Sequence, residues 1–188
     1  MKTYFNLFIL FSFIASSHFT YSQYEIVPPK GYDLQIGNMV SMLENLKGRV
    51  TQSVATISQK ETDFLLDQDA NRIGAMIYHL AATEKVYQLI TFENRQFNKE
   101  EEKTWGVALS LGENAREQFK DQPISYYLSI WDEVRAETLR LLKEKDDKWF
   151  SKKAKGAGGM TNHWAWFHVM EHQANHMGQI RLIQKRVK

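Results

Sequence analysis

The sequence predicts an all-α fold, a bundle of four long helices, and three observations lead to this prediction. Apolar residues recur every three or four positions in four separate segments, which is the period of an amphipathic helix. No segment alternates polar and apolar residues in the way that predicts a half-buried strand. A long irregular stretch separates the second segment from the third, which is typical of a bundle with one long connection.

The first helix follows a short lead-in. Residues 27–31 (Val-Pro-Pro-Lys-Gly) predict a turn or extended chain, because proline disfavours helix in the residue before it and glycine relaxes the backbone after it. The helical pattern starts near Asp33, and apolar side chains then recur from Ile36 to Ile57. We therefore expect one long amphipathic helix here.

A polar break at residues 58–69 precedes the second helix. The apolar positions of this helix run from Ile73 to Ile90, and Asp69 is a candidate for its N-cap because a carboxylate there accepts from free backbone N–H groups. His79 falls near the middle of the segment.

The rest of the chain predicts two further long helices. Residues 92–121 mix charged and apolar side chains with glycines, so we expect one or two short helices there. The third long helix covers the periodic pattern at 127–142, and a flexible basic loop follows at 152–159. Thr161 is placed to cap the fourth helix, which includes residues 164–183.

The N-terminus has the pattern of an export signal. Lys2 gives a positive start, 5–15 is strongly apolar, and small residues at 20–22 precede a plausible cut before Gln23. The apolar run is short for a lasting membrane span, although an uncleaved anchor is the alternative. We expect residues 1–22 to be a signal peptide and the mature protein to be exported, either periplasmic or secreted, without a stable membrane anchor.

Composition limits what the mature chain can do. Removing residues 1–22 takes away one lysine and no acid, so the formal net charge falls from +2 to +1. Such a chain has no broad electrostatic reason to bind nucleic acid or an anionic membrane. After a lead-in at 23–32, residues 33–188 are of a length for one domain. The basic loop at 152–159 lacks the preceding strand and the Gly-Lys-Ser/Thr ending of a phosphate-binding loop.

Four histidines indicate a metal site. His168, His172 and His176 are four residues apart in the fourth helix, so their side chains stack on one face, where two imidazoles can reach one ion. One helix rarely closes a site alone, and His79 on a facing helix is the natural third ligand. A histidine taken singly is more often a hydrogen-bonded core residue, but three rings along one face favour a metal. Spacing leaves the pairs His168/His172 and His172/His176 equivalent.

The absence of cysteine restricts the metal chemistry. Because the chain has no cysteine, it has neither disulfides nor a thiolate-built structural zinc site. Nitrogen and oxygen ligands suit a divalent ion such as zinc, nickel, iron or manganese, with copper also compatible. Zinc and nickel are the favoured ions for a site made of imidazoles.

Two segments resemble a known family. Residues 77–84 (Ile-Tyr-His-Leu-Ala-Ala-Thr-Glu) and 172–180 (His-Gln-Ala-Asn-His-Met-Gly-Gln-Ile) are similar to motifs of the DinB/YfiT-like superfamily, and the likeness covers most of 33–188. The resemblance implies an up-down-down-up four-helix bundle that binds a metal. The metal ligands that it implies are His79, His172 and His176.

The same resemblance bears on activity. Family members include thiol-dependent transferases and isomerases, so it implies a thiol S-transferase or a metal-dependent hydrolase acting on an unidentified small molecule. Many relatives carry a further histidine and an arginine where Asn175 and Met177 stand here, so no substrate carries over. Export argues against thiol transfer, because small thiols are kept reduced inside the cell.

Three hypotheses follow for function. The first is an exported metal-dependent hydrolase or group-transfer enzyme with an open coordination position. The second is a metal-binding protein without catalysis, and the third is a helical interaction module, with a homodimer possible. His168 either shuttles protons or has a hydrogen-bonding or packing role beside the metal ligands, and Glu84 is expected to point away from the metal. The aromatic residues Tyr78, Trp164 and Trp166 either line a cavity or belong to the core.

Overall fold

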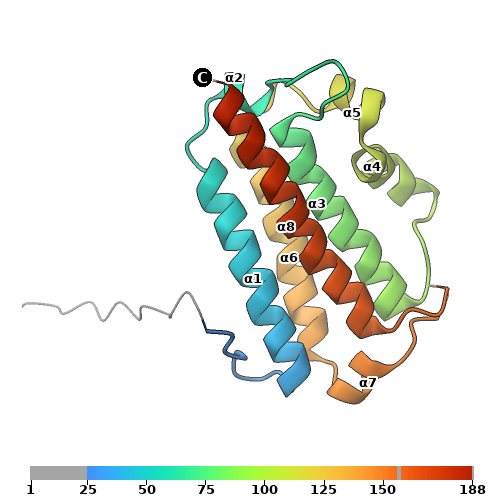
Figure 1. The fold of residues 1–188 in the computed structure, drawn as a ribbon. Coiled ribbons are helices and arrows are strands. Elements are labelled where there is room, and N and C mark those ends of the chain that lie inside the picture. Colours follow the sequence, from blue (N-terminus) through green and yellow to red (C-terminus); the bar gives the residue numbers. More distant parts are fainter. Residues whose placement is uncertain (1–24, 156–157, 188) are drawn as a thin grey trace, which may run out of the picture.

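The computed structural model describes residues 25–155 and 158–187. Four long helices lie side by side as a bundle (Figure 1): α1 (Leu34–Val54), α3 (Ile73–Gln88), α6 (Ile124–Lys143) and α8 (Asn162–Arg186). Within those ranges the only pairing of β type is an isolated bridge between Lys153 and Thr161. The predicted all-α bundle is therefore confirmed. The predicted signal peptide lies outside the described residues.

The four helices run up, down, down and up. In Figure 1, α1 and α8 rise while α3 and α6 descend. The connection from α3 to α6 makes this possible, because η1 (Leu89–Glu93), α4 (Lys99–Ser110) and α5 (Gly112–Gln118) climb along the outside of α3. The predicted short helices at 92–121 correspond to α4 and α5. None of the described helices is long and apolar enough to cross a membrane.

Local signals account for the short elements and the helix ends. The stretch expected as a polar break contains α2 (Gln59–Thr62), which starts with a capping box between Ser58 and Glu61. The prediction that Asp69 caps α3 was wrong, because the helix begins after Arg72, whose side chain makes no capping bond. The predicted cap of α8 is confirmed.

That cap is a hydrogen bond from the backbone N–H of Trp164 to the hydroxyl of Thr161, at 3.1 Å. It fixes the start of the helix that carries His168, His172 and His176. The remaining short helix, α7 (Asp147–Ser151), leads from α6 toward this end of the bundle.

Helix α3 is buried on almost every side. It packs against α6 and α8 within the bundle and against α4 on its outer face, so even its polar residues are enclosed. Gly74 allows α3 to approach α6 closely. A Cβ at this position would lie 2.9 Å from Cδ2 of the buried Tyr127 ring on α6, and closer still to Cε2. His79 thus sits on a helix with little freedom to move.

We expect Gly74→Ala to lower the free energy of unfolding by about 1–3 kcal/mol, because the added methyl overlaps the Tyr127 ring in a packed core. Gly178→Ala on α8 is the matched control, since a Cβ there meets no atom within 4 Å. It should stabilise the helix by up to about 1 kcal/mol. Urea unfolding of both variants checks this, and a stabilising Gly74→Ala would show that the α3–α6 contact is looser than described.

A buried ion pair joins three of the long helices. The guanidinium of Arg135 on α6 donates from Nε and Nη2 to the two carboxylate oxygens of Glu84 on α3, at 2.7 and 2.9 Å. It also donates to Glu44 and to the carbonyl of Leu43 on α1, while the indole N–H of Trp131 donates to Glu84 at 3.1 Å. Every oxygen of the buried carboxylate has a donor, so the charge is fully compensated.

Candidate metal centre

Three histidines from two helices meet between α3 and α8. His79 comes from the middle of α3, and His172 and His176 occupy successive turns of α8. Their candidate ligand atoms all lie within 4.8 Å of one another, and Nε2 of His79 is 2.7 Å from Nε2 of His172. The structure thus brings together the three residues that the family resemblance named.

Hydrogen bonds orient two of the three rings. Nδ1–H of His79 donates to the carbonyl of Ala108 on α4 at 2.9 Å, and Nδ1–H of His176 donates to Oε1 of Gln179 at 3.0 Å. These acceptors place the ring protons on Nδ1, so the lone pair of each Nε2 is directed to the centre of the cluster. In the metal-free state His172 then donates its Nε2–H to His79.

The cluster fits a divalent ion in chemistry and in size. Imidazole nitrogens are common ligands of zinc and nickel. Two nitrogens on a tetrahedral zinc ion, each about 2.0–2.1 Å from it, lie about 3.3 Å apart. The separations between the ligand atoms, from 2.7 Å up to 4.8 Å, bracket that value. Small rotations of the rings are enough to bring three nitrogens to one ion, which fills three of the four positions of a tetrahedral site.

The cluster keeps its imidazoles neutral. Burial lowers the pKa of His172 to about 3, with the neighbouring His176, His79 and His168 adding to the shift. Burial and the nearby His79 lower the pKa of His176 to about 4, and burial lowers the pKa of His79 despite its bond to Ala108. At neutral pH all three rings therefore have lone pairs available for a metal.

We expect the metal-free protein to become less stable as pH falls below about 6.5. In that range the histidines of the unfolded chain bind protons, whereas folded His172 and His176 stay neutral until about pH 3 and 4. The unfolded state binds more protons, so the free energy of unfolding decreases with falling pH. Urea unfolding between pH 7 and 4.5 should show a shallower decline for His172→Ala than for the wild type. Asn175→Ala is the control, and an unchanged slope in His172→Ala contradicts the prediction.

His168 lies beside the cluster, not within it. Its ring centroid is 5.5 Å from that of His172, and the ring stacks on Trp164 at 5.3 Å with only 2° between the planes. Nδ1 is 3.6 Å from a carboxylate oxygen of Glu171, and Tyr87 of α3 flanks the ring. Of the two histidine pairs that spacing left open, His172 and His176 are the one that meets His79.

The aromatic candidates separate into core and surface. Tyr78 is buried against Trp105 and Phe119, and Trp166 is fully buried in the bundle. Trp164, by contrast, is 48% exposed at the start of α8. Only Trp164 therefore remains available to contact a ligand, while the other two belong to the core.

Three polar groups near the site were not identified from the sequence. The carbonyl of Ala108 is backbone and leaves no sequence signal. Gln179 does leave one, because it follows His176 by three residues on the same helical face. Thr83, one turn after His79 on α3, is buried, and its hydroxyl has no partner among the described residues.

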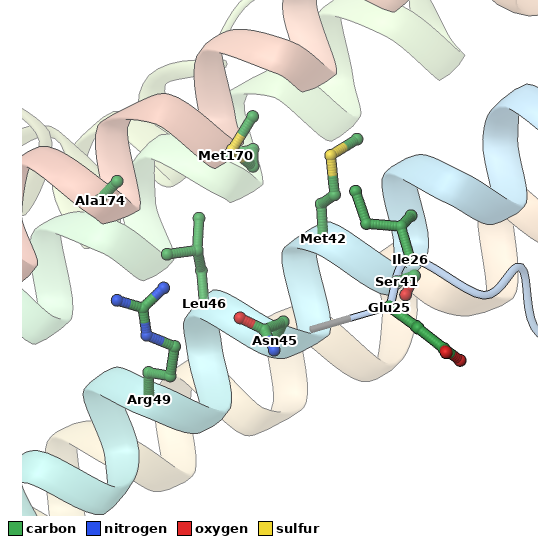
Figure 2. A pocket seen from close by; sticks show the side chains of 9 residues that line it. All are labelled: Glu25, Ile26, Ser41, Met42, Asn45, Leu46, Arg49, Met170 and Ala174. Carbon is green, nitrogen blue, oxygen red and sulfur yellow. The ribbon is translucent and has the colours of Figure 1, made fainter. Parts of the chain in front are cut away.

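Access to the cluster is from the side of His172. His79 and His176 are 8% and 7% exposed, whereas His172 is partly open to solvent. A cavity of about 200 Å³ also begins at Gln179, between the start of α3 and the end of α8. A larger cavity of about 350 Å³ is lined by none of the three histidines (Figure 2).

Comparison with known families agrees with this arrangement. No curated protein matches the sequence. The family model described as mycothiol-S-transferase matches residues 38–188, a range that includes all four long helices except the first turn of α1 and that contains all three clustered histidines. The chain therefore belongs to the mycothiol-S-transferase family, within the DinB-like superfamily that the helical bundle and the histidine motifs indicated.

Proposed function

We propose that the protein is a metal-dependent group-transfer enzyme, and that the group it transfers is the whole thiolate (RS–) of a small thiol, which forms a new bond through its sulfur as a leaving group departs from the acceptor. The observation that carries this proposal is the cluster of His79, His172 and His176, with Nε2 atoms turned inward and one side open to solvent. The family match supplies the reaction class. When bound, a divalent ion supplies a positive charge that lowers the pKa of a thiol or a water beside it.

The chain itself holds the site in place. Ala108 and Gln179 fix the rings of His79 and His176 through their Nδ1 hydrogens. The buried α3 restricts the movement of His79. Such rigid support keeps the metal-binding histidines in position, which a site that binds and converts a substrate requires.

We assign His168 the role of moving a proton between the site and water. Its side chain is 32% exposed, and its ring is next to that of His172. An imidazole can accept a proton on one ring nitrogen while it donates one from the other, which suits proton transfer. The ring stacks on Trp164, and Nδ1 lies 3.6 Å from a carboxylate oxygen of Glu171.

Hydrolysis is the second candidate. The apolar N-terminal segment that predicts export favours hydrolysis. An exported enzyme would meet few reduced small thiols, whereas water is always available as the second reactant. The same open side at His172 would admit a substrate for either reaction.

A paired assay distinguishes these candidates. The protein loaded with zinc or nickel is mixed with 1-chloro-2,4-dinitrobenzene and mycothiol, glutathione or cysteine, and formation of the C–S bond with loss of chloride is followed by absorbance. Nitrophenyl esters in the absence of thiol test hydrolysis. Thiol transfer should be faster than the uncatalysed rate and should be lost in His176→Ala but kept in Asn175→Ala. A wild-type rate no faster than the uncatalysed reaction would leave a metal-binding protein without catalysis, and equal accelerated rates in both variants would show that the histidine cluster takes no part in the reaction.

Export is proposed as well, from the Lys2, 5–15 and 20–22 pattern. N-terminal sequencing of the protein isolated from its own host should begin at or near Gln23. Recovery of the intact Met1 terminus from a soluble cytoplasmic fraction contradicts it.

A further inference from the structure

A second cavity lies on the opposite side of α8 from the histidine cluster. It holds about 350 Å³ between α1, α8 and the chain that leads into α1 (Figure 2). Met170 and Ala174 line it, and each is two residues from His172, which places both about 160° round the helix from that ring. This cavity, which we call the α1–α8 groove, is thus separate from the metal centre.

The walls of the groove are largely apolar. Met42 and Leu46 point from α1 toward α8, and Met170 faces them from the other side (Figure 2). Ile26, from the lead-in, covers one end and is 58% exposed. Thioether side chains adapt to ligands of different shape, so two methionines among the apolar residues favour a flexible hydrocarbon over a rigid ligand.

Arg49 supplies the one positive charge among the described lining residues. Its guanidinium extends from α1 toward α8 beside Leu46 (Figure 2), and the side chain is partly buried. Arg49 makes no hydrogen bond or ion pair with any other residue in 25–155 or 158–187. A partly buried guanidinium presents five donors in a planar fork that matches a carboxylate.

We propose that the α1–α8 groove binds an amphipathic monocarboxylate, with its hydrocarbon chain along the apolar walls and its carboxylate on Arg49. The length of the groove suits such a ligand, because Arg49 follows Met42 by seven positions on α1, which is a rise of about 10 Å along the helix. Charge sets the orientation of the ligand in the groove. Arg49 attracts its carboxylate at one end, whereas Glu25, whose own carboxylate points away from the groove, lies at the lead-in end. A medium-chain fatty acid has this shape and charge.

Calorimetric titration of the zinc-loaded protein tests this proposal. Decanoate below its micellar concentration should bind with one site per chain, and 1-decanol, which lacks the charge, should bind at least about tenfold more weakly. Arg49→Gln should weaken decanoate binding about 10- to 100-fold while leaving decanol unchanged. Arg181→Gln, which removes an exposed arginine elsewhere on α8, is the matched control and should have no effect.

A second pair of variants locates the ligand. Ala174 is exposed on α8 and Ser41 lies on α1 at the groove, so Ala174→Phe and Ser41→Phe should each block decanoate while the helical circular dichroism stays as in the wild type. Absence of decanoate binding overturns the proposal, as does equal binding by Arg49→Gln and Arg181→Gln. Unchanged binding by both phenylalanine variants places the ligand elsewhere and overturns it too. None of these three results depends on the reaction at the metal centre.

Discussion

Replacing His176 with alanine will lower the affinity for a divalent ion by well over 100-fold. The side chain supplies one of three nitrogen ligands, and removal of a group that only orients a ligand already costs about 10- to 100-fold. His176 is buried and held by Gln179, so no nearby group replaces it. The same loss is expected for His79→Ala and His172→Ala, because each ring supplies one inward nitrogen.

Competition with a chromophoric chelator measures these affinities on protein made without a histidine tag. His168→Ala is the control, since its ring stands beside the cluster, 5.5 Å from His172, and it should cost no more than about 100-fold. Burial holds the pKa of His172 at about 3 and that of His176 at about 4, so in the folded protein protons should compete with the ion for these rings only below about pH 4, not near the usual imidazole pKa of about 6.5. If His168→Ala abolished binding and His176→Ala left it intact, the ligand pair would be His168 and His172.

Replacing Arg135 with alanine will lower the free energy of unfolding by about 3–5 kcal/mol. The Arg135 and Glu84 side chains are 4% and 0% exposed, and without the guanidinium the carboxylate of Glu84 stays buried without its counter-charge. In the wild type, burial alone would raise the pKa of Glu84, but the charge and hydrogen bonds of Arg135 outweigh burial and hold that pKa below its usual value. The loss also frees α1, because Arg135 donates to Glu44 and to the carbonyl of Leu43.

Urea unfolding at pH 7 tests this prediction. Arg140→Ala is the matched control on the same helix, since Arg140 is exposed and, among the residues that the structure describes, pairs only with the surface residues Glu137 and Glu144. Such surface pairs are worth under about 1 kcal/mol. The double replacement of Glu84 and Arg135 by methionine should recover most of the loss, because no unpaired charge is left. An Arg135→Ala variant as stable as Arg140→Ala would show that the pair contributes nothing.

The long helices were predictable because their signal is local. Apolar residues three and four apart place one face of each helix toward the core, whatever the partner helix is. The spacing of His168, His172 and His176 was readable for the same reason, whereas the choice between the two pairs needed the position of His79 across the bundle. The resemblance to the family motifs indicated the pair His172 and His176, and the structure places this pair beside His79.

Features that depend on contacts between distant residues were not predictable from spacing. Glu84 was expected to point away from the metal, and it does contact α6, but its partner Arg135 is 51 residues away in the chain. The carbonyl of Ala108 has no side-chain signal at all. The α1–α8 groove likewise depends on long-range packing, because its lining combines residues of α1, such as Met42, with residues of α8, such as Met170.

Anomalous scattering from crystals of the metal-loaded protein, collected at the absorption edge of the ion, tests most directly whether the three histidines hold it. We predict one strong peak per chain, about 2.0–2.2 Å from an imidazole nitrogen of each of His79, His172 and His176. A map without a peak there, or with the peak at His163 or at His168 and His172 alone, would contradict the three-histidine centre.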